Sequence, residues 1–333
     1  MLLLPHPIHW NDHQQSFRIY TMEPPLPQSA PTIIFNPAAG GNLRRIDESR
    51  LRKVLREEGL PDEWRSTQIE FDADRILEED EADGPVVVIG GDGTLQRASR
   101  VLANSSRPLA IVPSGTGNVM ALRLGIPMGL RSALRLVKEG VPRRVDLGRS
   151  EEEPFLLAVG GGFDGHLIRE AGRELKNVLG KSAYVISAAR HLPINHHAFV
   201  VTVDDAEHEI TAASVMVANF GTQMGNWIFP PEADGQDGML DVAIIRAQTF
   251  EQVVTLAAAS FGARPRPHGG LTLLRGQKVS VRCEDPIPIQ LDGDDQGDRR
   301  EINARIEPGG LRVLVPRRTR PSSMVWPPPL DWP

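Results

Sequence analysis

Residues 86–94 read VVVIGGDGT, a short run of β-branched residues that ends abruptly in glycines, one acid and a threonine. A continuous apolar run of this length predicts a strand buried on both faces, as in a parallel sheet. Glycine lets backbone N–H groups approach an anion closely, so the loop after the strand suits a phosphate. A bare carboxylate would repel that phosphate. Asp92 therefore either caps a helix or acts through a cation such as Mg²⁺.

Strand-like runs and helical spacing alternate through the first part of the chain. Further predicted strands are TIIF (32–35), STQIEF (66–71) and PLAIVP (108–113). Apolar residues recur at helical spacing over 43–55 and 95–102. Such alternation predicts a parallel sheet with helices on both faces, and ligands of these sheets bind beyond the carboxyl ends of the strands.

From about Val145 the pattern changes to runs in which apolar and polar residues nearly alternate. These runs are FLLAVG (155–160), AFVVTVD (198–204), EITAASVMVANF (209–220), MLDVAIIR (239–246), QKVSVRC (277–283), PIPIQLDG (286–293) and LRVLVP (311–316). Helical segments are expected near 165–179, 181–191 and 249–262, the last with Thr249 as N-cap. The pattern favours a mostly antiparallel β domain.

Length, charge and cysteine content exclude several classes of protein. The chain has 333 residues, enough for two domains, and a net charge of −6, which argues against non-specific nucleic-acid binding. Its one cysteine, Cys283, excludes an internal disulfide and a thiolate metal cluster. No apolar run approaches the roughly 18 residues of a transmembrane helix. We expect a cytoplasmic protein, with loosely ordered ends at 1–30 and 317–333.

Three loops rich in small residues follow predicted strands: NPAAGG (36–41), GGDGT (90–94) and PSGTGN (113–118). Each one alone is compatible with a tight turn between strand and helix. Three of them at one edge of a sheet favour a cradle for phosphates, because each places backbone amides and a helix start at the same edge.

Two other glycine motifs are weaker. GKS (180–182) resembles the end of a P-loop, but Leu175 stands where that motif requires glycine. GGGFDG (160–165) matches a dinucleotide fingerprint, but no second strand ending in an acid follows about 20 residues later. We favour neither as a nucleotide site.

These segments together resemble the diacylglycerol kinase catalytic-domain superfamily, which includes bacterial lipid kinases and sphingosine and ceramide kinases. The resemblance extends from about Thr32 to Pro316 and is carried by NPAAGG, GGDGTL, PSGTGN, GGGFDG, DGQDGMLDV and LDGD. GGDGT alone is shared with NAD kinases and phosphofructokinases. Its combination with the loops before and after it is much more specific.

The resemblance implies an N-terminal α/β ATP-binding domain, expected at 31–144, and a C-terminal antiparallel β-sandwich domain for the lipid, expected at 145–316. It also implies transfer of the ATP γ-phosphate to a lipid hydroxyl with Mg²⁺. The expected partner is a lipid such as diacylglycerol at a membrane surface, met peripherally at the inner face. A homo-oligomer is compatible with the sequence, which gives no signal for or against it.

The resemblance also implies site residues. ATP contacts carry over onto Asn36, Pro37, Gly40, Thr67, Gly90, Gly91, Asp92, Gly93, Thr94, Ser114, Gly115, Thr116 and Asn118. Besides Asp92, the expected metal ligands are Asp234, Asp237 and the backbone carbonyl of Met239; a plain hairpin turn is an equal alternative there. Asp164 corresponds to an acid near the lipid headgroup, or else it caps a helix.

One departure concerns the general base. The family's Asp-Gly-Glu reads Asp292-Gly293-Asp294 here. Asp294 would accept the lipid hydroxyl proton with support from Asp292, but its side chain is one methylene shorter and reaches about 1.5 Å less far. This departure keeps open a catalytically impaired nucleotide-binding regulator of the same fold, and the shared GGDGT motif keeps open an NAD kinase. The apolar run 227–229 fits core packing somewhat better than contact with a bilayer.

Overall fold

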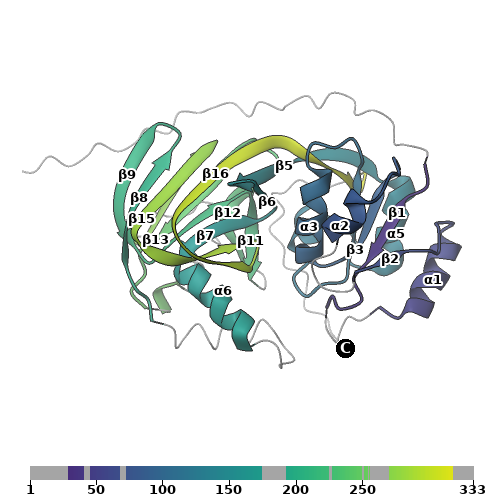
Figure 1. Ribbon diagram of the computed structural model, residues 1–333, viewed down its shortest axis with the longest axis horizontal. Helices are drawn as coiled ribbons and strands as arrows, with labels where there is room; N and C mark the ends of the chain where they lie inside the picture. Colours follow the sequence, from purple (N-terminus) through teal and green to yellow (C-terminus); the bar gives the residue numbers. More distant parts are fainter. Residues whose placement is uncertain are drawn as a thin grey trace, which may run out of the picture.

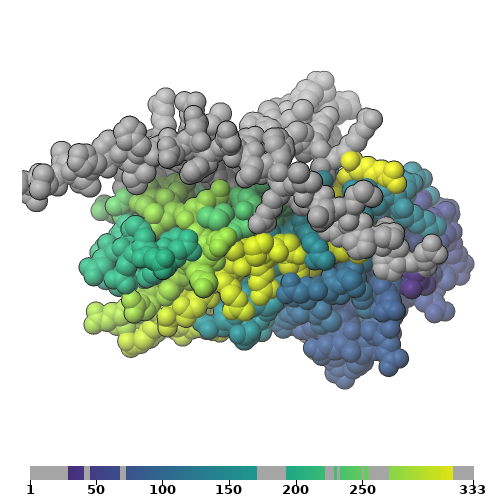
Figure 2. Space-filling view, turned by 90° about the horizontal axis from the view of Figure 1, so that it is seen from above, coloured from purple at the N-terminus to yellow at the C-terminus, as the bar shows by residue number. Residues whose placement is uncertain are grey.

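The computed structural model describes residues 29–40, 46–67, 73–174, 193–224, 227–249, 251–253, 255 and 270–317. Figure 1 shows an α/β part on one side and a β-rich part on the other, with the long strand β16 (Asp294–Val315) passing from one into the other. The space-filling view from above shows β16, in yellow, at the surface between the two parts (Figure 2).

The α/β part is built on four parallel strands in the order β2-β1-β3-β4. These are β1 (Thr32–Phe35), β2 (Arg65–Ser66), β3 (Val86–Gly90) and β4 (Leu109–Pro113). The helices are α1 (Glu48–Glu57), α2 (Ala73–Glu78), α3 (Asp92–Leu102), α4 (Val119–Arg123) and α5 (Leu130–Glu139). Every residue of β3 and β4 is buried, as expected for strands covered on both faces.

The β-rich part is mostly antiparallel and carries one described helix, α6 (Phe163–Glu174). Its strands are β5 (Val141–Ser150), β6 (Glu153–Phe155), β7 (Ala158–Gly162), β8 (His197–Val203), β9 (Ala206–Ala212), β10 (Ser214–Ala218), β13 (Leu240–Ile245), β14 (Leu271–Gly276), β15 (Lys278–Leu291) and β16. A separate pair is formed by β11 (Phe220–Met224) and β12 (Trp227–Asp234).

The two parts share one sheet. Val313 of β16 pairs in parallel with Leu109 of β4, so the described strands other than β11 and β12 form a single mixed sheet of 14 strands. Each part has its own main apolar core, one around β1, β3 and β4 and the other around β7, β10 and β15. The predicted fold class, a parallel α/β domain followed by an antiparallel β domain, is confirmed.

Several elements differ in detail from the prediction. The run 141–150 is a strand, β5, that the sequence analysis did not predict, and it spans the expected domain boundary at 144. The runs 277–283 and 286–293 merge into β15. Near the predicted helix at 249–262, the Thr249 hydroxyl accepts a 3.3 Å hydrogen bond from the Gln252 amide, as an N-cap would. The GKS motif, the predicted helix at 181–191 and Gly262, the expected C-cap of the helix at 249–262, lie outside the described residues.

Candidate functional site: glycine loops and a β-hairpin turn

Asp92 lies at the start of α3 and reaches across to the next glycine loop. Its carboxylate accepts hydrogen bonds from the backbone amides of Val119 (3.0 Å) and Met120 (3.1 Å), the first two residues of α4. Burial raises the pKa of Asp92, although these amide bonds stabilise its charged form. The carboxylate at the tip of β3 thus joins the GGDGT loop to the helix that follows PSGTGN.

The two loops touch through glycines. A Cβ atom added to Gly115 would lie 2.5 Å from the Gly91 Cα atom, so the backbones leave no room for a side chain. The Ser114 amide also donates a 2.9 Å hydrogen bond to the Gly90 carbonyl. Gly93 differs, because a Cβ atom there would meet nothing within 4 Å. Gly91 and Gly115 serve packing, and Gly93 faces open space.

Asn118 closes the PSGTGN loop on itself. Its side chain accepts a 2.8 Å hydrogen bond from the Gly115 amide and donates a 2.7 Å bond to the Gly115 carbonyl. Its φ of 51° is left-handed, a conformation that asparagine tolerates better than most residues. The expected contact residue Asn118 is therefore a buried structural element of the loop, whereas its neighbour Thr116 is exposed.

At the end of β1, the Asn36 amide donates a 3.0 Å hydrogen bond to the Thr94 hydroxyl and ties the first loop to the second. Thr67 and Ser114 lie after β2 and β4, at the same edge of the sheet. Their hydroxyl oxygens are buried, yet they form no hydrogen bond within the described structure. Buried polar groups are rarely left unpaired. This edge therefore carries unsatisfied groups suited to a polar ligand.

Of the remaining expected ATP contacts, Pro37 and Gly40 lie in the turn that follows β1. Gly40 has a φ of 79°, which suits glycine. Gly41, the last residue of that motif, is outside the described residues. The structure therefore brings the three predicted loops to one edge, as far as they are described.

The Asp292-Gly293 turn connects β15 to β16 and belongs to the β-rich part. Both residues have positive φ angles, 50° and 90°, as in the two-residue turns that favour Asp-Gly. The Asp292 carboxylate accepts hydrogen bonds from the amides of residues 156–158, at 2.6, 2.8 and 3.0 Å. Burial raises its pKa to about 7 against these amide bonds, and the negative charge of Asp92 adds to the rise. The carboxylates of Asp92 and Asp292 are thus close enough for their negative charges to repel each other.

Asp294, the predicted general base, is the first residue of β16 and is exposed. The residues after it are held by Arg169 of α6. This guanidinium forms two hydrogen bonds to Asp295, at 2.9 and 3.0 Å, and an ion pair with Asp298 at 2.6 Å. These carboxylates hold the pKa of Arg169 above its usual value. The strand that carries Asp294 is therefore clamped to α6 just beyond the turn.

Asp164 lies in the first turn of α6. It accepts hydrogen bonds from the Ser214 hydroxyl at 2.8 Å and from the Gln290 amide at 3.2 Å. Burial raises its pKa despite these bonds. The oxygen of Gln290 accepts a 2.9 Å bond from the Gly293 amide. Asp164 is thereby connected to the same turn that carries Asp292.

The other expected metal ligands lie on a second loop, between β12 and β13. The Asp237 carboxylate is hydrogen bonded and ion paired with Arg275, and it accepts a 3.1 Å bond from the Met239 amide. Asp234 lies near Asp237 and Arg123; burial and then the charge of Asp237 raise its pKa. Within the described residues, no group of three or more His, Cys, Asp or Glu side chains suited to a metal ion is found.

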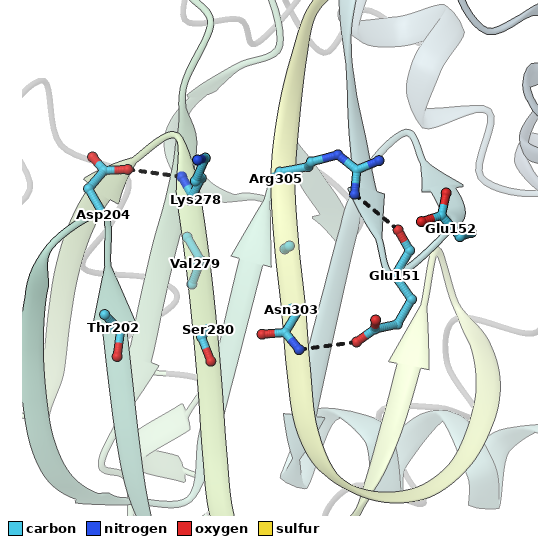
Figure 3. Close-up of a pocket in the computed structure, with 10 residues that line it drawn as sticks. Glu151, Glu152, Thr202, Asp204, Lys278, Val279, Ser280, Asn303 and Arg305 are labelled. Carbon is cyan, nitrogen blue, oxygen red and sulfur yellow. Dashed lines mark hydrogen bonds between the residues drawn. The ribbon is translucent and has the colours of Figure 1, made fainter.

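A hollow of about 300 Å³ lies elsewhere, on the outer face of the β-rich part (Figure 3). Mostly polar residues line it, from β8, β15, β16 and the turn between β5 and β6, among them Lys278 and Arg305. Two dashed hydrogen bonds, from Asn303 and from Arg305 to Glu151, close one side of it. It contains none of the predicted site residues.

Sequence reasoning missed three residues that bind the predicted acids or their neighbours. These are Gln290, which contacts Asp164 and Gly293, Arg169, which contacts Asp295, and Arg275, which contacts Asp237. Gln290 carried a usable signal, since a glutamine in the mostly apolar run PIPIQL needs a buried hydrogen-bond partner. The two arginines gave none, because their partners are distant in sequence. Of the described residues, none forms a helix long and apolar enough to span a membrane.

Comparison with known proteins agrees with this architecture. Residues 31–150 match the diacylglycerol kinase catalytic domain, and residues 158–315 match the YegS C-terminal NAD kinase beta sandwich-like domain. A Pseudomonas aeruginosa protein named "Probable lipid kinase YegS-like" is 30% identical over 85% of this chain and 93% of its own length. An uncharacterized Synechocystis protein, sll0036, is 28% identical over 85% of this chain and 70% of its own.

The fold also matches a solved structure. A crystal structure described as a diacylglycerol kinase from Bacillus anthracis (strain Sterne) superposes with a TM-score of 0.67 at 20% identity, over 87% of this chain and 98% of that one. At this identity the likeness concerns the fold.

Proposed function

Since the chain belongs to the YegS-like lipid kinase family with a diacylglycerol kinase catalytic domain, we propose that it transfers the γ-phosphate of ATP to the hydroxyl group of a lipid. Diacylglycerol is the first candidate acceptor. One observation supports this most directly. The glycine loops and the unpaired hydroxyls of Thr67 and Ser114 meet at one edge of the sheet, and the Asp292 carboxylate of the β15–β16 turn lies close enough to Asp92 for their charges to interact.

The ATP phosphates would lie over the GGDGT and PSGTGN loops. Gly93 leaves open space there, so a phosphate can approach the backbone amides at the start of α3. The hydroxyls of Thr67 and Ser114 would gain their missing partners from the nucleotide. Asn36, Thr94 and Asn118 would act indirectly, because each is already bonded within or between the loops and fixes their shape.

Magnesium would neutralise charge on the transferring phosphate. Asp92, directly or through water, is the residue that would hold it, with Asp292 near by. Because the oxygens of both carboxylates already accept backbone amides, contact through water is favoured, and the repulsion between the two negative charges favours a positive ion near them. Asp92 keeps a structural role as well, since its oxygens also cap α4.

Asp294 would accept the proton of the lipid hydroxyl as that oxygen attacks the γ-phosphate. Its exposure at the start of β16 leaves it accessible to a lipid that arrives from a membrane surface. Phosphoryl transfer depends mainly on positioning and charge neutralisation, so an aspartate in place of glutamate is compatible with activity. Asp164 already accepts hydrogen bonds from Ser214 and Gln290. We therefore propose that it positions the turn through Gln290 and does not contact the lipid directly.

The decisive experiment is phosphate transfer by the purified full chain. The protein is incubated with γ-labelled ATP, Mg²⁺, NAD⁺ and vesicles that contain diacylglycerol among other lipids, and the labelled product is identified. A labelled lipid with wild type and none with Asp92→Asn supports the proposal. ATP binding without any transfer would instead favour the nucleotide-binding regulator, and label on NAD⁺ would favour the NAD kinase.

A further inference from the structure

Residues 234–239, the last residue of β12 and the loop that leads to β13, are held in place by hydrogen bonds of the protein itself. The shape of this loop is fixed by the buried carboxylate of Asp146, which accepts a 2.6 Å hydrogen bond from the Gly238 amide and a 2.7 Å bond from the Gly309 amide. The Asp146 amide donates a 2.8 Å bond to the Gly235 carbonyl. The protein backbone therefore holds this loop without help from a bound ion.

Arg275 neutralises two carboxylates at this loop, those of Asp237 and Asp241. It lies on β14 directly opposite Asp241 of β13, and the sheet register places the two side chains together. The guanidinium contacts both Asp241 oxygens at 3.2 Å and also pairs with Asp237. The charges of Asp241 and Asp237 keep the pKa of Arg275 above its usual value against the cost of its burial. Both oxygens of Asp237 therefore already have a partner, and one of these partners is a cation of the protein.

Arg123 approaches the inner side of the loop from the end of α4. Its guanidinium donates a hydrogen bond to the Ala233 carbonyl, and its positive charge acts on Asp234. It is partly buried, and this burial lowers the pKa of Arg123 more than the charge of Asp234 raises it. Arg123 is therefore a nearby cation that offsets only part of the effect of burial and of Asp237 on the pKa of Asp234.

The charges nearly balance without a metal. Three carboxylates, those of Asp234, Asp237 and Asp241, meet two guanidinium groups. Mg²⁺ binds through carboxylates and needs near-octahedral oxygen geometry, so it would have to displace Arg275 from Asp237 and leave a half-buried guanidinium with one partner fewer. The residues present do not fit the structural Mg²⁺ that the resemblance implied for this loop.

We infer that in this chain Arg275 and Arg123 take the place of a divalent cation at residues 234–239, so that the β-rich part folds and stays folded without metal. The inference goes beyond the proposed kinase function and does not depend on it. Only the Mg²⁺ that accompanies ATP would then be required.

Thermal unfolding and Mn²⁺ binding, both without nucleotide, test the inference on the full chain. We expect the same unfolding midpoint for wild type in EDTA and in millimolar Mg²⁺ or Ca²⁺. Arg275→Met should lower the midpoint, because it leaves Asp237 and Asp241 without their cation. Arg282→Met is the matched control. Its ion pair with Glu207 is exposed, and such pairs contribute little to stability.

Electron paramagnetic resonance of added Mn²⁺ gives the direct answer. Wild type and Asp237→Asn should show the same Mn²⁺ binding, since no ion sits on this loop. A wild-type Mn²⁺ ion that is lost in Asp237→Asn, or a midpoint that falls in EDTA and recovers with Mg²⁺, would overturn the inference. So would an Arg275→Met midpoint no lower than that of Arg282→Met. None of these readouts uses kinase activity, so the proposed function can fail or hold separately.

Discussion

Gln290 connects Asp164 to the turn that carries the candidate catalytic acids. Its amide nitrogen donates to Asp164 at 3.2 Å, and its oxygen accepts from the Gly293 amide at 2.9 Å. The side chain is buried, so both bonds are shielded from water. The buried acid of α6 and the tip of the β15–β16 hairpin are therefore fixed relative to one another through one glutamine.

Gln290→Leu should lower kcat by about tenfold to a hundredfold, because a catalytic turn that is no longer fixed spends less time in the reactive geometry. The KM for ATP should change little, since the glycine loops are untouched. Steady-state kinetics with the accepted lipid measure both constants. Gln96→Leu is the control. It removes another buried glutamine, which donates to the Pro154 carbonyl and not to Asp164 or to the turn. Equal kcat losses in the two variants would contradict a positioning role for Gln290.

Gly93→Ala and Gly115→Ala should separate folding from nucleotide binding. Gly115→Ala forces a Cβ atom to 2.5 Å from the Gly91 Cα atom and should cost about 1–3 kcal/mol of stability. Gly93→Ala meets no atom within 4 Å and lies in a helix, so stability should stay unchanged or rise by up to about 1 kcal/mol. Its methyl group would, however, occupy the space proposed for phosphate.

Chemical denaturation and calorimetric ATP titration of the same two variants give the comparison. Weaker ATP binding by a fully stable Gly93→Ala protein is the expected outcome. Wild-type ATP affinity in that variant would place the phosphates elsewhere.

Two substitutions of Asp92 should separate its structural role, the cap of α4, from its proposed role in binding Mg²⁺. Asp92→Ala removes the cap of α4 and should cost about 1 kcal/mol of stability in addition to activity. Asp92→Asn keeps one oxygen to accept an amide hydrogen bond but loses the charge that would hold Mg²⁺. It should therefore be closer to wild type in stability while remaining inactive. Transfer at the wild-type rate by Asp92→Asn would refute the metal role and leave only the cap.

The sequence predicted the strands and loops that depend only on residues close to one another in the chain. The buried runs at 86–90 and 109–113 are strands, and the glycine loops after them meet because parallel strands end at a common edge. Local patterns did not reveal how β16 joins the two parts. Residues 301–306 do alternate between exposed and buried, but the charged residues among them hid a strand that continues from Asp294 to Val315.

The loops of the candidate site could be predicted from the sequence, but the hydrogen bonds and ion pairs that connect them could not. The bonds from Asp92 to α4 and from Asp292 to residues 156–158 depend on which backbone amides are left unpaired after folding. The pairing of Asp237 with Arg275 depends on the register between β13 and β14. These are tertiary facts, and no periodicity or motif in one chain encodes them directly.

Asp292 should make stability depend on pH in a definite direction. Its pKa is raised from 3.8 to about 7 in the folded protein, so the folded state holds its proton more tightly than the unfolded chain. The stabilisation from this carboxyl is therefore complete below about pH 4 and is lost as the pH rises through about 7. Asp292→Asn cannot titrate and should lack this part of the slope.

Denaturant unfolding of wild type and Asp292→Asn at several pH values between about 4 and 8 measures the difference. The free energy of unfolding of wild type should fall more steeply with rising pH than that of the variant. Parallel curves would show that Asp292 titrates alike in the folded and unfolded states, and a steeper fall in Asp292→Asn would reverse the sign argued above.

Asp294 gives the sharpest test of the proposed chemistry, because the family residue can be restored. Asp294→Asn should lower kcat by about 10²–10⁴-fold, as expected when a general base is lost, with little change in stability since the side chain is exposed. Asp294→Glu should match or exceed wild type, because its carboxylate reaches further toward the lipid hydroxyl. Lipid phosphorylation under saturating ATP measures both variants. An inactive wild type that Asp294→Glu activates would identify the chain as the impaired regulator. Full activity in Asp294→Asn would mean that the lipid proton leaves by another route.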